Sequence, residues 1–290
     1  MVMSNNWYED LNEYIKLGEP KPEEKTVAWQ IAIGLQAVDG LSVSDYLLNT
    51  AKENIEGKIT GKEANDRISN YYENRCDRYA IEAGTKEADI VAGRIASLLT
   101  ENIFSFTPAF LMSVHRYLFK DVFMHAGKIR TCNIYKNEWV LNGKSVFYAS
   151  YDSIPMIMEY DFKTEAAFSY KNLSKDAVNR HIAKFTRDIW QIHPFCEGNT
   201  RSTAVFIIKY LNSLGYSISN EAFAKYSWYF RNALVRANYN DLPNGVHATT
   251  VYLEKFFDNL LYNGNNELKN RYLHVVLHKV APVRERGLKS

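Results

Sequence analysis

Residues 174–215 read SKDAVNRHIAKFTRDIWQIHPFCEGNTRSTAVFIIKYLNSLG and predict two helices joined by a short turn. Ser174 can cap the first helix, because its side-chain oxygen accepts a free backbone N–H at a helix start. That helix must end at His193, since Pro194 disfavours helical geometry in the residue before it. The second helix runs until Gly215, because glycine tolerates the left-handed conformation that ends helices.

Helical start and stop signals recur along most of the remaining chain. Thr60 and Glu63, for example, have the spacing of a capping box, and Thr107-Pro108 combines a cap residue with proline at the first helical position. The signals predict helices at about 24–38, stopped by Asp39-Gly40; from Ser44 to Gly57; from Thr60 to near Arg78; at 86–99; from Thr107 onward, with Phe110, Leu111, Val114, Tyr117 and Leu118 on its apolar face; and at 152–170. Two or three further helices are expected through the segments 220–240, 246–261 and 266–278, before a solvated tail at 282–290.

Residues 128–149 break this helical pattern. They alternate in polarity, are rich in β-branched and aromatic residues, and contain Asn142-Gly143, a strong turn signal. We therefore expect a β-hairpin here, which we call the flap. The predicted fold class is all-α with one small β-hairpin.

Bulk composition excludes several classes of protein. The 290 residues are 46% hydrophobic, enough for one large or two small folded domains rather than a disordered chain. Basic residues exceed acidic ones by two, 35 against 33, so no global field favours nucleic acid or an anionic membrane. Three scattered cysteines without CxxC spacing suit a reducing cytoplasm, and neither a signal sequence nor a membrane span is expected.

The turn between the two quoted helices has the residues for phosphate chemistry. A loop that feeds a helix N-terminus presents unpaired N–H groups, Gly198 permits close approach, and Arg201 adds a fork for phosphate oxygens. Glu197 would be unfavourable there unless a cation such as Mg²⁺ lies between it and the phosphates. His193 has a side chain suited to removing a hydroxyl proton. The plainer alternative is a helix end at His193, a solvated Glu197, a capping Asn199 and a surface ion pair at Arg201.

The stretch His193-Pro194-Phe195-Cys196-Glu197-Gly198-Asn199-Thr200-Arg201 resembles the Fic family signature HPF-x-[DE]-G-N-G-R-x-x-R. The similarity covers roughly residues 105–236 and includes HRYLFKDVFMHAGKIR upstream. It implies a Fic-type helical bundle that transfers AMP from ATP, with Mg²⁺, to a Ser, Thr or Tyr hydroxyl of a protein. It further implies His193 as general base, Phe195 as loop anchor, Glu197 as Mg²⁺ ligand, and Gly198, Asn199, Thr200 and Arg201 as the phosphate-binding positions.

Two positions depart from that signature. Thr200 stands in place of its second glycine and Ala204 in place of its second arginine. Ala204 can contact no phosphate, so Arg231 or Arg236 could take that role only if the fold brings one of them near. Lower ATP affinity or another nucleotide donor stays open.

The resemblance also assigns roles outside the signature. In the family the flap binds an extended target segment by strand addition, here at Lys136, Asn137, Glu138, Trp139 and Val140, although a purely structural hairpin is an equal alternative. Residues 1–82 resemble an antitoxin-like inhibitory segment, followed by a core at 83–290. Its motif [ST]-x-x-x-E-[GN] reads Leu35, Asp39 and Gly40, so Asp39 is the inhibitory candidate.

Two other functions remain open from the sequence. One is a hydrolase that removes AMP from a modified protein, with Asp39 orienting water. The other is a catalytically weak nucleotide-binding regulator. Self-modification of a tyrosine and homo-oligomer formation also remain open, and His115 is interpreted as a core or surface histidine.

Overall fold

The computed structural model describes residues 19–73, 83–218 and 222–275, and over these ranges the fold is all-α. Arg78 and the predicted tail at 282–290 lie outside the described residues. The elements are α2 (Pro22–Gly34), η1 (Leu35–Asp39), α3 (Asp45–Ile55), α4 (Gly61–Glu73), α5 (Ala83–Thr100), α6 (Pro108–Phe119), η2 (Trp139–Leu141), α7 (Ile154–Ala166), α8 (Lys175–Ile192), α9 (Asn199–Ser213), α10 (Ala222–Ala237), η3 (Leu242–Asn244), α11 (Val251–Tyr262) and η4 (Asn270–Tyr272).

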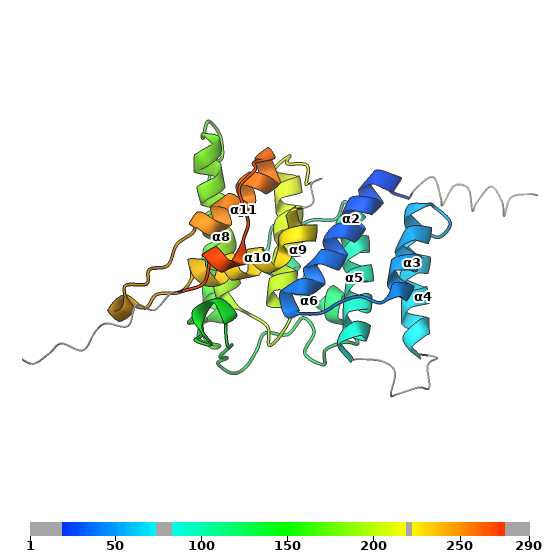
Figure 1. The fold of residues 1–290 in the computed structure, drawn as a ribbon, viewed down its shortest axis with the longest axis horizontal. Helices are drawn as coiled ribbons and strands as arrows, with labels where there is room; N and C mark the ends of the chain where they lie inside the picture. Colours follow the sequence, from blue (N-terminus) through cyan, green and yellow to red (C-terminus); the bar gives the residue numbers. More distant parts are fainter. Residues whose placement is uncertain (1–18, 74–82, 219–221, 276–290) are drawn as a thin grey trace, which may run out of the picture.

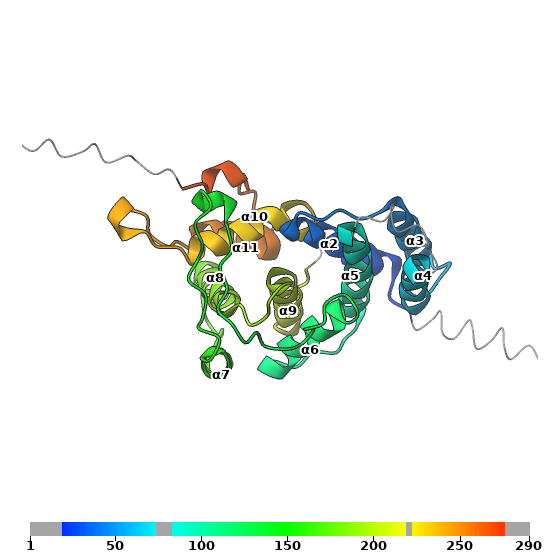
Figure 2. The same cartoon turned by 90° about the horizontal axis from the view of Figure 1, so that it is seen from below.

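Helix α9 is the centre of the fold. Figure 2 shows it in the middle of a ring formed by α2, α5, α6, α8 and α10. Every residue from Asn199 to Leu211 is buried. A helix that is buried on all sides can only be stable when other helices surround it. The quoted stretch therefore supplies both the central helix and, at its start, the proposed site.

The predicted helix starts are confirmed by side-chain caps. Ser44, Thr107 and Ser174 each accept the backbone N–H three residues on, at the starts of α3, α6 and α8. Thr60 and Glu63 form the reciprocal capping box at the start of α4, with distances of 2.7 and 3.2 Å. These local bonds satisfy donors that would otherwise be free.

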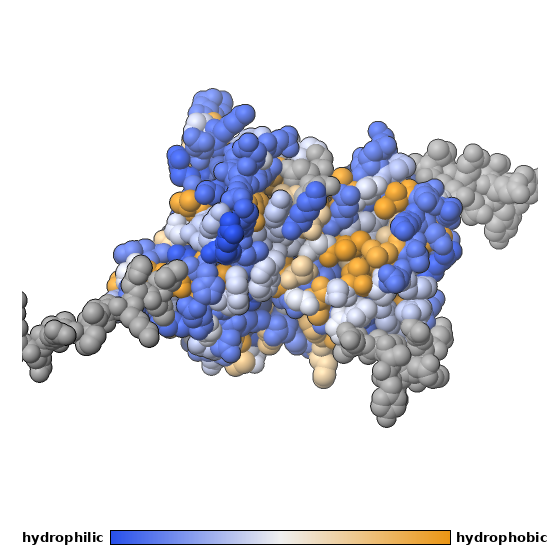
Figure 3. Space-filling model, viewed as in Figure 1, coloured by the Kyte–Doolittle hydropathy of each residue, from blue (hydrophilic) through white to orange (hydrophobic). Residues whose placement is uncertain are grey.

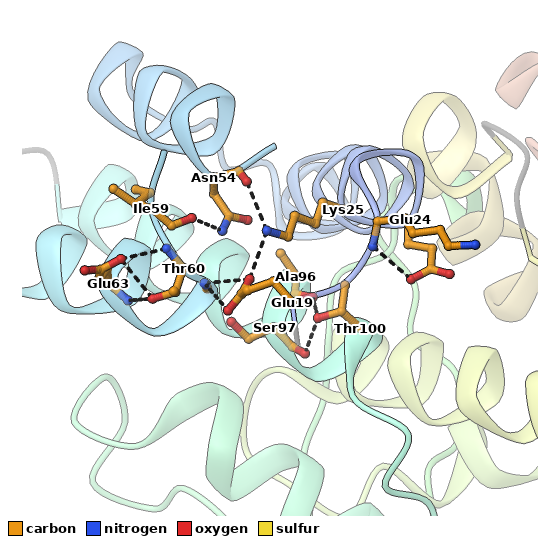
Figure 4. Close-up of polar contacts among 12 residues, drawn as sticks. Glu19, Glu24, Lys25, Asn54, Ile59, Thr60, Glu63, Ala96, Ser97 and Thr100 are labelled. Carbon is orange, nitrogen blue, oxygen red and sulfur yellow. Dashed lines mark hydrogen bonds and ion pairs between the residues drawn. The ribbon is translucent and has the colours of Figure 1, made fainter. Parts of the chain in front are cut away.

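Helix α2 is held at both ends. At its start, Lys25 is 5% exposed, forms an ion pair with Glu19 at 2.9 Å and donates to the carbonyl of Asn54 at 3.2 Å (Figure 4). At its end, a Cβ on Gly34 would lie 2.5 Å from the backbone of Ala224 on α10, so the two helices touch backbone to backbone. Figure 1 shows the consequence: α2 crosses from α3 and α4 to the central helices, and η1 follows it directly.

The predicted β-hairpin is wrong, because residues 128–149 contain no strand. The predicted turn does form: Asn142 and Gly143 have φ of 55° and 84°, and Lys144 N–H donates to Leu141 O at 3.2 Å. Just before it, Val140 and Leu141 are at most 1% exposed and sit in the short helical turn η2. A curled backbone lets two consecutive residues face the same core, whereas neighbouring side chains of a strand point to opposite faces.

The predicted helix at 266–278 is also wrong where it is described, up to Val275. The chain there has no regular secondary structure apart from η4. Val275 N–H donates to Val140 O at 2.8 Å, and the Asn142 side chain donates to Val275 O at 2.9 Å. These bonds with the flap satisfy the backbone groups that a helix would have paired internally.

The surface is largely hydrophilic. Figure 3 shows an apolar area on the half of this face that carries α2, α3 and α5. Among the described residues, no helix has the length and apolar character needed to cross a membrane.

Candidate active site

The 193–201 loop has two residues in the left-handed region. His193 ends α8 with φ of 47°, an uncommon conformation for a residue with a Cβ, and Gly198 precedes α9 with φ of 74°. Arg130, 2% exposed, stabilises the first bend by donating from Nε to His193 O at 2.7 Å, while its backbone N–H donates to Pro194 O at 2.9 Å. The loop is thus positioned by its own backbone geometry and by the start of the flap.

His115 stabilises the second half of the loop. It is fully buried on α6 and stacks on Phe195 with ring centres 3.7 Å apart. Gly127 N–H donates to its Nδ1 at 2.8 Å, so the proton lies on Nε2, which donates to Glu197 O at 2.9 Å. Burial lowers the pKa of His115 to about 4. The sequence placed His115 in the core or at the surface, and the structure shows that it lies in the core and positions Phe195 and Glu197.

We expect His115 to make stability depend on pH. Between pH 6.5 and about 4 the unfolded chain binds a proton that the folded chain does not, so the free energy of unfolding falls as pH decreases. At about 1.36 kcal/mol per pKa unit, the His115 contribution is on the order of 3 kcal/mol. His115→Phe should flatten this slope in urea unfolding, whereas His247→Phe at an exposed histidine should not. Equal slopes for the two variants would contradict this role.

His193 is buried at the end of α8, and a hydrogen bond decides which of its ring nitrogens carries the proton. Its ring is 3% exposed, and Nδ1 lies 2.9 Å from Trp190 O, so Nδ1 carries a proton and Nε2 is left as an acceptor. Burial, followed by the nearby charge of Lys136, holds its pKa well below the usual 6.5, which keeps the ring neutral. The Tyr148 ring lies 4.0 Å away, centre to centre, and partly covers it.

The start of α9 offers backbone donors without a side-chain cap. Its N-cap residue is Gly198, which has no side chain to accept the free N–H groups, unlike the capped starts of α3, α6 and α8. A Cβ there would also collide with the Phe119 ring. The side chain of Asn199 bonds both N–H and O of Phe195, and Thr200 Oγ accepts from Trp190 Nε1 at 3.0 Å. Asn199 and Thr200 therefore shape the loop with their side chains and leave their N–H groups for an anion.

Arg201 is 1% exposed and is engaged by three side chains from the N-terminal half of the protein. Its Nη2 lies 2.6 Å from Glu87 on α5, and its Nη1 donates to Gln36 at 3.1 Å. Its Nε lies 2.8 Å from Asp39 Oδ2, which is an ion-pair distance, but this contact does not have hydrogen-bond geometry. The sequence singled out Asp39 but missed Gln36 and Glu87. Gln36 lies three residues before Asp39 on the 3₁₀ helix η1, and this spacing places the two side chains on the same side. No local sequence signal identifies Glu87.

Neither arginine that the sequence offered in place of the second signature arginine has a hydrogen bond or ion pair to the 193–201 loop among the described residues. Ala204 is fully buried inside the bundle. Arg231 pairs with the buried Glu138 at 2.5 Å. Within the described residues, Arg236 has no hydrogen bond to the 193–201 loop, and its Nε and Nη1 are buried without a partner.

Glu197 faces outward and pairs with the flap. Its side chain is 55% exposed, and its Oε2 lies 2.8 Å from Lys136 Nζ. Proteins commonly bind Mg²⁺ through one or two carboxylates together with substrate phosphates and several waters, and the lysine ammonium already marks a cation position beside Glu197. The donor set therefore fits a magnesium ion shared with a nucleotide. Of the other flap residues, Asn137 and Trp139 are exposed, whereas Glu138 and Val140 are buried, and their backbones bond within the protein: Glu138 N–H donates to Lys144 O at 3.0 Å and Val140 O accepts from Val275 N–H.

Comparison with known proteins adds three similarities. Residues 105–211 match the model of the Fic/DOC family. The probable protein adenylyltransferase y4lH of Sinorhizobium fredii (strain NBRC 101917 / NGR234) is 28% identical over 131 residues, 45% of this chain and 64%, less than two thirds, of the relative. Two Bartonella structures are 16% identical: the N-terminal FIC domain of Bep8 from Bartonella sp. 1-1C (TM-score 0.48, covering 63% of this chain and 88% of its own) and the N-terminal Fic domain of a Bep effector from Bartonella sp. AR 15-3 (0.42, 69% and 79%).

Proposed function

Residues 105–211 form a Fic/DOC family domain, and from this premise we propose that the protein is an adenylyltransferase that moves AMP from ATP to a protein hydroxyl. One observation carries the proposal. A neutral imidazole with an unprotonated Nε2 stands at the end of α8, a short loop away from the uncapped start of α9. Base and phosphate cradle are therefore adjacent, as acid–base transfer of a phosphoryl-type group requires.

The residues divide the reaction between them. The N–H groups at the start of α9 and the Arg201 guanidinium bind phosphate oxygens. Mg²⁺ bound through Glu197 and the phosphates would neutralise charge. His193 Nε2 takes the proton of the target hydroxyl, whose oxygen attacks the α-phosphorus while pyrophosphate leaves. The flap holds the target segment at the exposed Asn137 and Trp139, because the backbone groups of Glu138 and Val140 are already paired within the protein.

We further propose that this conformation is autoinhibited. Arg201 is shared between Asp39 and Glu87, so a nucleotide must displace at least one carboxylate before it can bind the guanidinium. His193, Asn199, Thr200 and Arg201 are each no more than 5% exposed, which describes a closed site. Asp39 supplies the charge that links this closure to the N-terminal segment, and Gln36 adds a hydrogen bond from the same turn, η1, which follows the anchored helix α2.

A nucleotide-binding regulator without turnover is the second candidate. It is favoured by Ala204, which leaves the site with one signature arginine. The reverse reaction, removal of AMP from a modified protein, needs an Asp39 carboxylate free to orient water, whereas Asp39 here pairs with Arg201 at 2.8 Å.

The test is intact-mass analysis of the full chain after incubation with each nucleoside triphosphate and Mg²⁺, alone and with a cell lysate. The wild type and Asp39→Ala are compared. An added AMP mass with ATP supports the proposal, and peptide mapping would begin with Tyr135, a flap hydroxyl that is 69% exposed. Nucleotide binding without any mass change would favour the regulator, and AMP loss from a modified protein would favour the hydrolase.

The pH dependence of transfer should reflect the lowered pKa of His193. Because the free ring stays neutral well below pH 6.5, kcat/KM should remain level from pH 8 to 6.5 and decline only in more acidic buffer. Initial rates of labelling across this range, with Asp39→Ala as the enzyme, measure the acid limb. A half-maximal rate near pH 6.5 or above would show that burial does not control this base.

A further inference from the structure

The site has a shortage of positive charge if Lys136 is left out. Asp39, Glu87 and Glu197 bring three carboxylates to the 193–201 loop, against one guanidinium at Arg201. A nucleoside triphosphate is itself strongly negative. Its binding therefore needs a further cation, and Ala204 cannot supply it.

The remaining cations near the loop are already engaged. Arg231 is bound to Glu138, which is fully buried and also accepts from Tyr148 at 3.2 Å. Arg130 donates to the carbonyls of His193, Cys132 and Ala149, and these bonds hold the loop and the flap together. Releasing either arginine would leave buried polar groups without partners, which is unfavourable.

Unlike these two arginines, Lys136 can change its partner without leaving a buried group unpaired. Its side chain is 24% exposed, and its single side-chain partner among the described residues is the half-exposed Glu197, at 2.8 Å. Its backbone N–H donates to Ser145 Oγ at 3.2 Å, which fixes the start of a flexible four-carbon chain. The charge of Lys136 also reaches His193, where it lowers the pKa of the ring. The ammonium therefore contacts the proposed metal ligand and is near enough to the proposed base to act on its charge.

We propose that Lys136 is a nucleotide-specificity residue, which turns from Glu197 onto the β- and γ-phosphates when a nucleoside triphosphate binds with Mg²⁺. Lys136, which lies on the flap, thereby supplies the positive charge that Ala204 does not provide. This inference rests on the proposed nucleotide site but not on the transfer reaction. The competing role is a plain counter-ion, in which Lys136 neutralises Glu197 and is displaced when a metal ion arrives.

The experiment compares the full-length Asp39→Ala protein with the same protein carrying Lys136→Met, Lys136→Arg or Lys144→Met. Lys144 is a second flap lysine, paired with Asp241 at 2.6 Å, and is the matched control. Calorimetry measures the Kd of ATP, ADP and AMP at constant ionic strength, together with the Mg²⁺ concentration that half-saturates ATP binding.

Lys136→Met should weaken ATP binding by about tenfold or more, the scale of one charge-assisted hydrogen bond, and should weaken AMP binding much less. Lys136→Arg should restore most of the affinity, and Lys144→Met should change neither ligand. Unchanged or tighter ATP binding with a lower Mg²⁺ requirement would identify a counter-ion and overturn the proposal, as would equal losses for ATP and AMP or no ATP binding to any variant. A Lys136-dependent ATP affinity without AMP transfer would leave this inference standing and reject the transferase.

Discussion

Replacing His193 with alanine is expected to reduce AMP transfer by about 10²–10⁴-fold, the usual contribution of a positioned general base. The reason is geometric: Trp190 O holds Nδ1–H, so that Nε2 is left to take the hydroxyl proton. The measurement is the single-turnover rate of labelling with ATP and Mg²⁺ in the Asp39→Ala background, which separates loss of the base from autoinhibition.

Two comparisons make this result specific. ATP affinity should stay within a few-fold in His193→Ala, because the proposed phosphate site consists of the start of α9 and Arg201 and does not include the imidazole. His247→Ala, at an exposed histidine outside the site, should label at the parent rate. Transfer that survives His193→Ala would mean that another group is the base.

The second large effect is expected at Asp39. Asp39→Ala should raise the transfer rate and the ATP affinity of the wild type by about tenfold or more, equivalent to at least about 1.4 kcal/mol, because Arg201 then has one carboxylate partner instead of two. Folding should be little affected, since Asp39 is 30% exposed and Lys25 still anchors α2. Initial labelling rates and calorimetric ATP affinity are the measurements.

Asp66→Ala, an exposed acid on α4, is the matched control and should match the wild type. Glu87→Gln should also increase activity, because it removes the other carboxylate from Arg201. If Asp39→Ala and Asp66→Ala behave alike, the ion pair at Arg201 is structural and the closed site has another cause.

The sequence identified both His193 and Asp39 as candidates, but not all of the contacts on which the two predictions depend. The 193–201 loop could be read directly, because its chemistry depends on residues within one short segment and on two helix boundaries. Asp39 could be named from its own motif. The pairing of Asp39 with Arg201 could not be predicted from the sequence. The expected partner of Asp39 at position 204 is an alanine, and Arg201, the partner that it has, is also bound by Gln36 and Glu87.

The errors share a physical cause. At 128–149 and 266–275 the local pattern favoured a hairpin and a helix, but each segment gains more by bonding to the other, as Val275 does to Val140 and Asn142. Burial of Val140 and Leu141 then bends the flap away from strand geometry. Local propensity is a weak prior that such tertiary contacts override.

The amino-acid sequence by itself determined where most helices begin and end, because caps, prolines and glycines act over three or four residues. It also determined the chemical groups of the 193–201 loop. Only the tertiary structure decided the contacts and charge states of these groups. His193 packs against Tyr148 and is neutral, and His115 holds the loop. Arg201 pairs with Asp39 and Glu87, and Lys136 pairs with Glu197. Those states depend on burial and on charges brought together from distant segments, which no local pattern records.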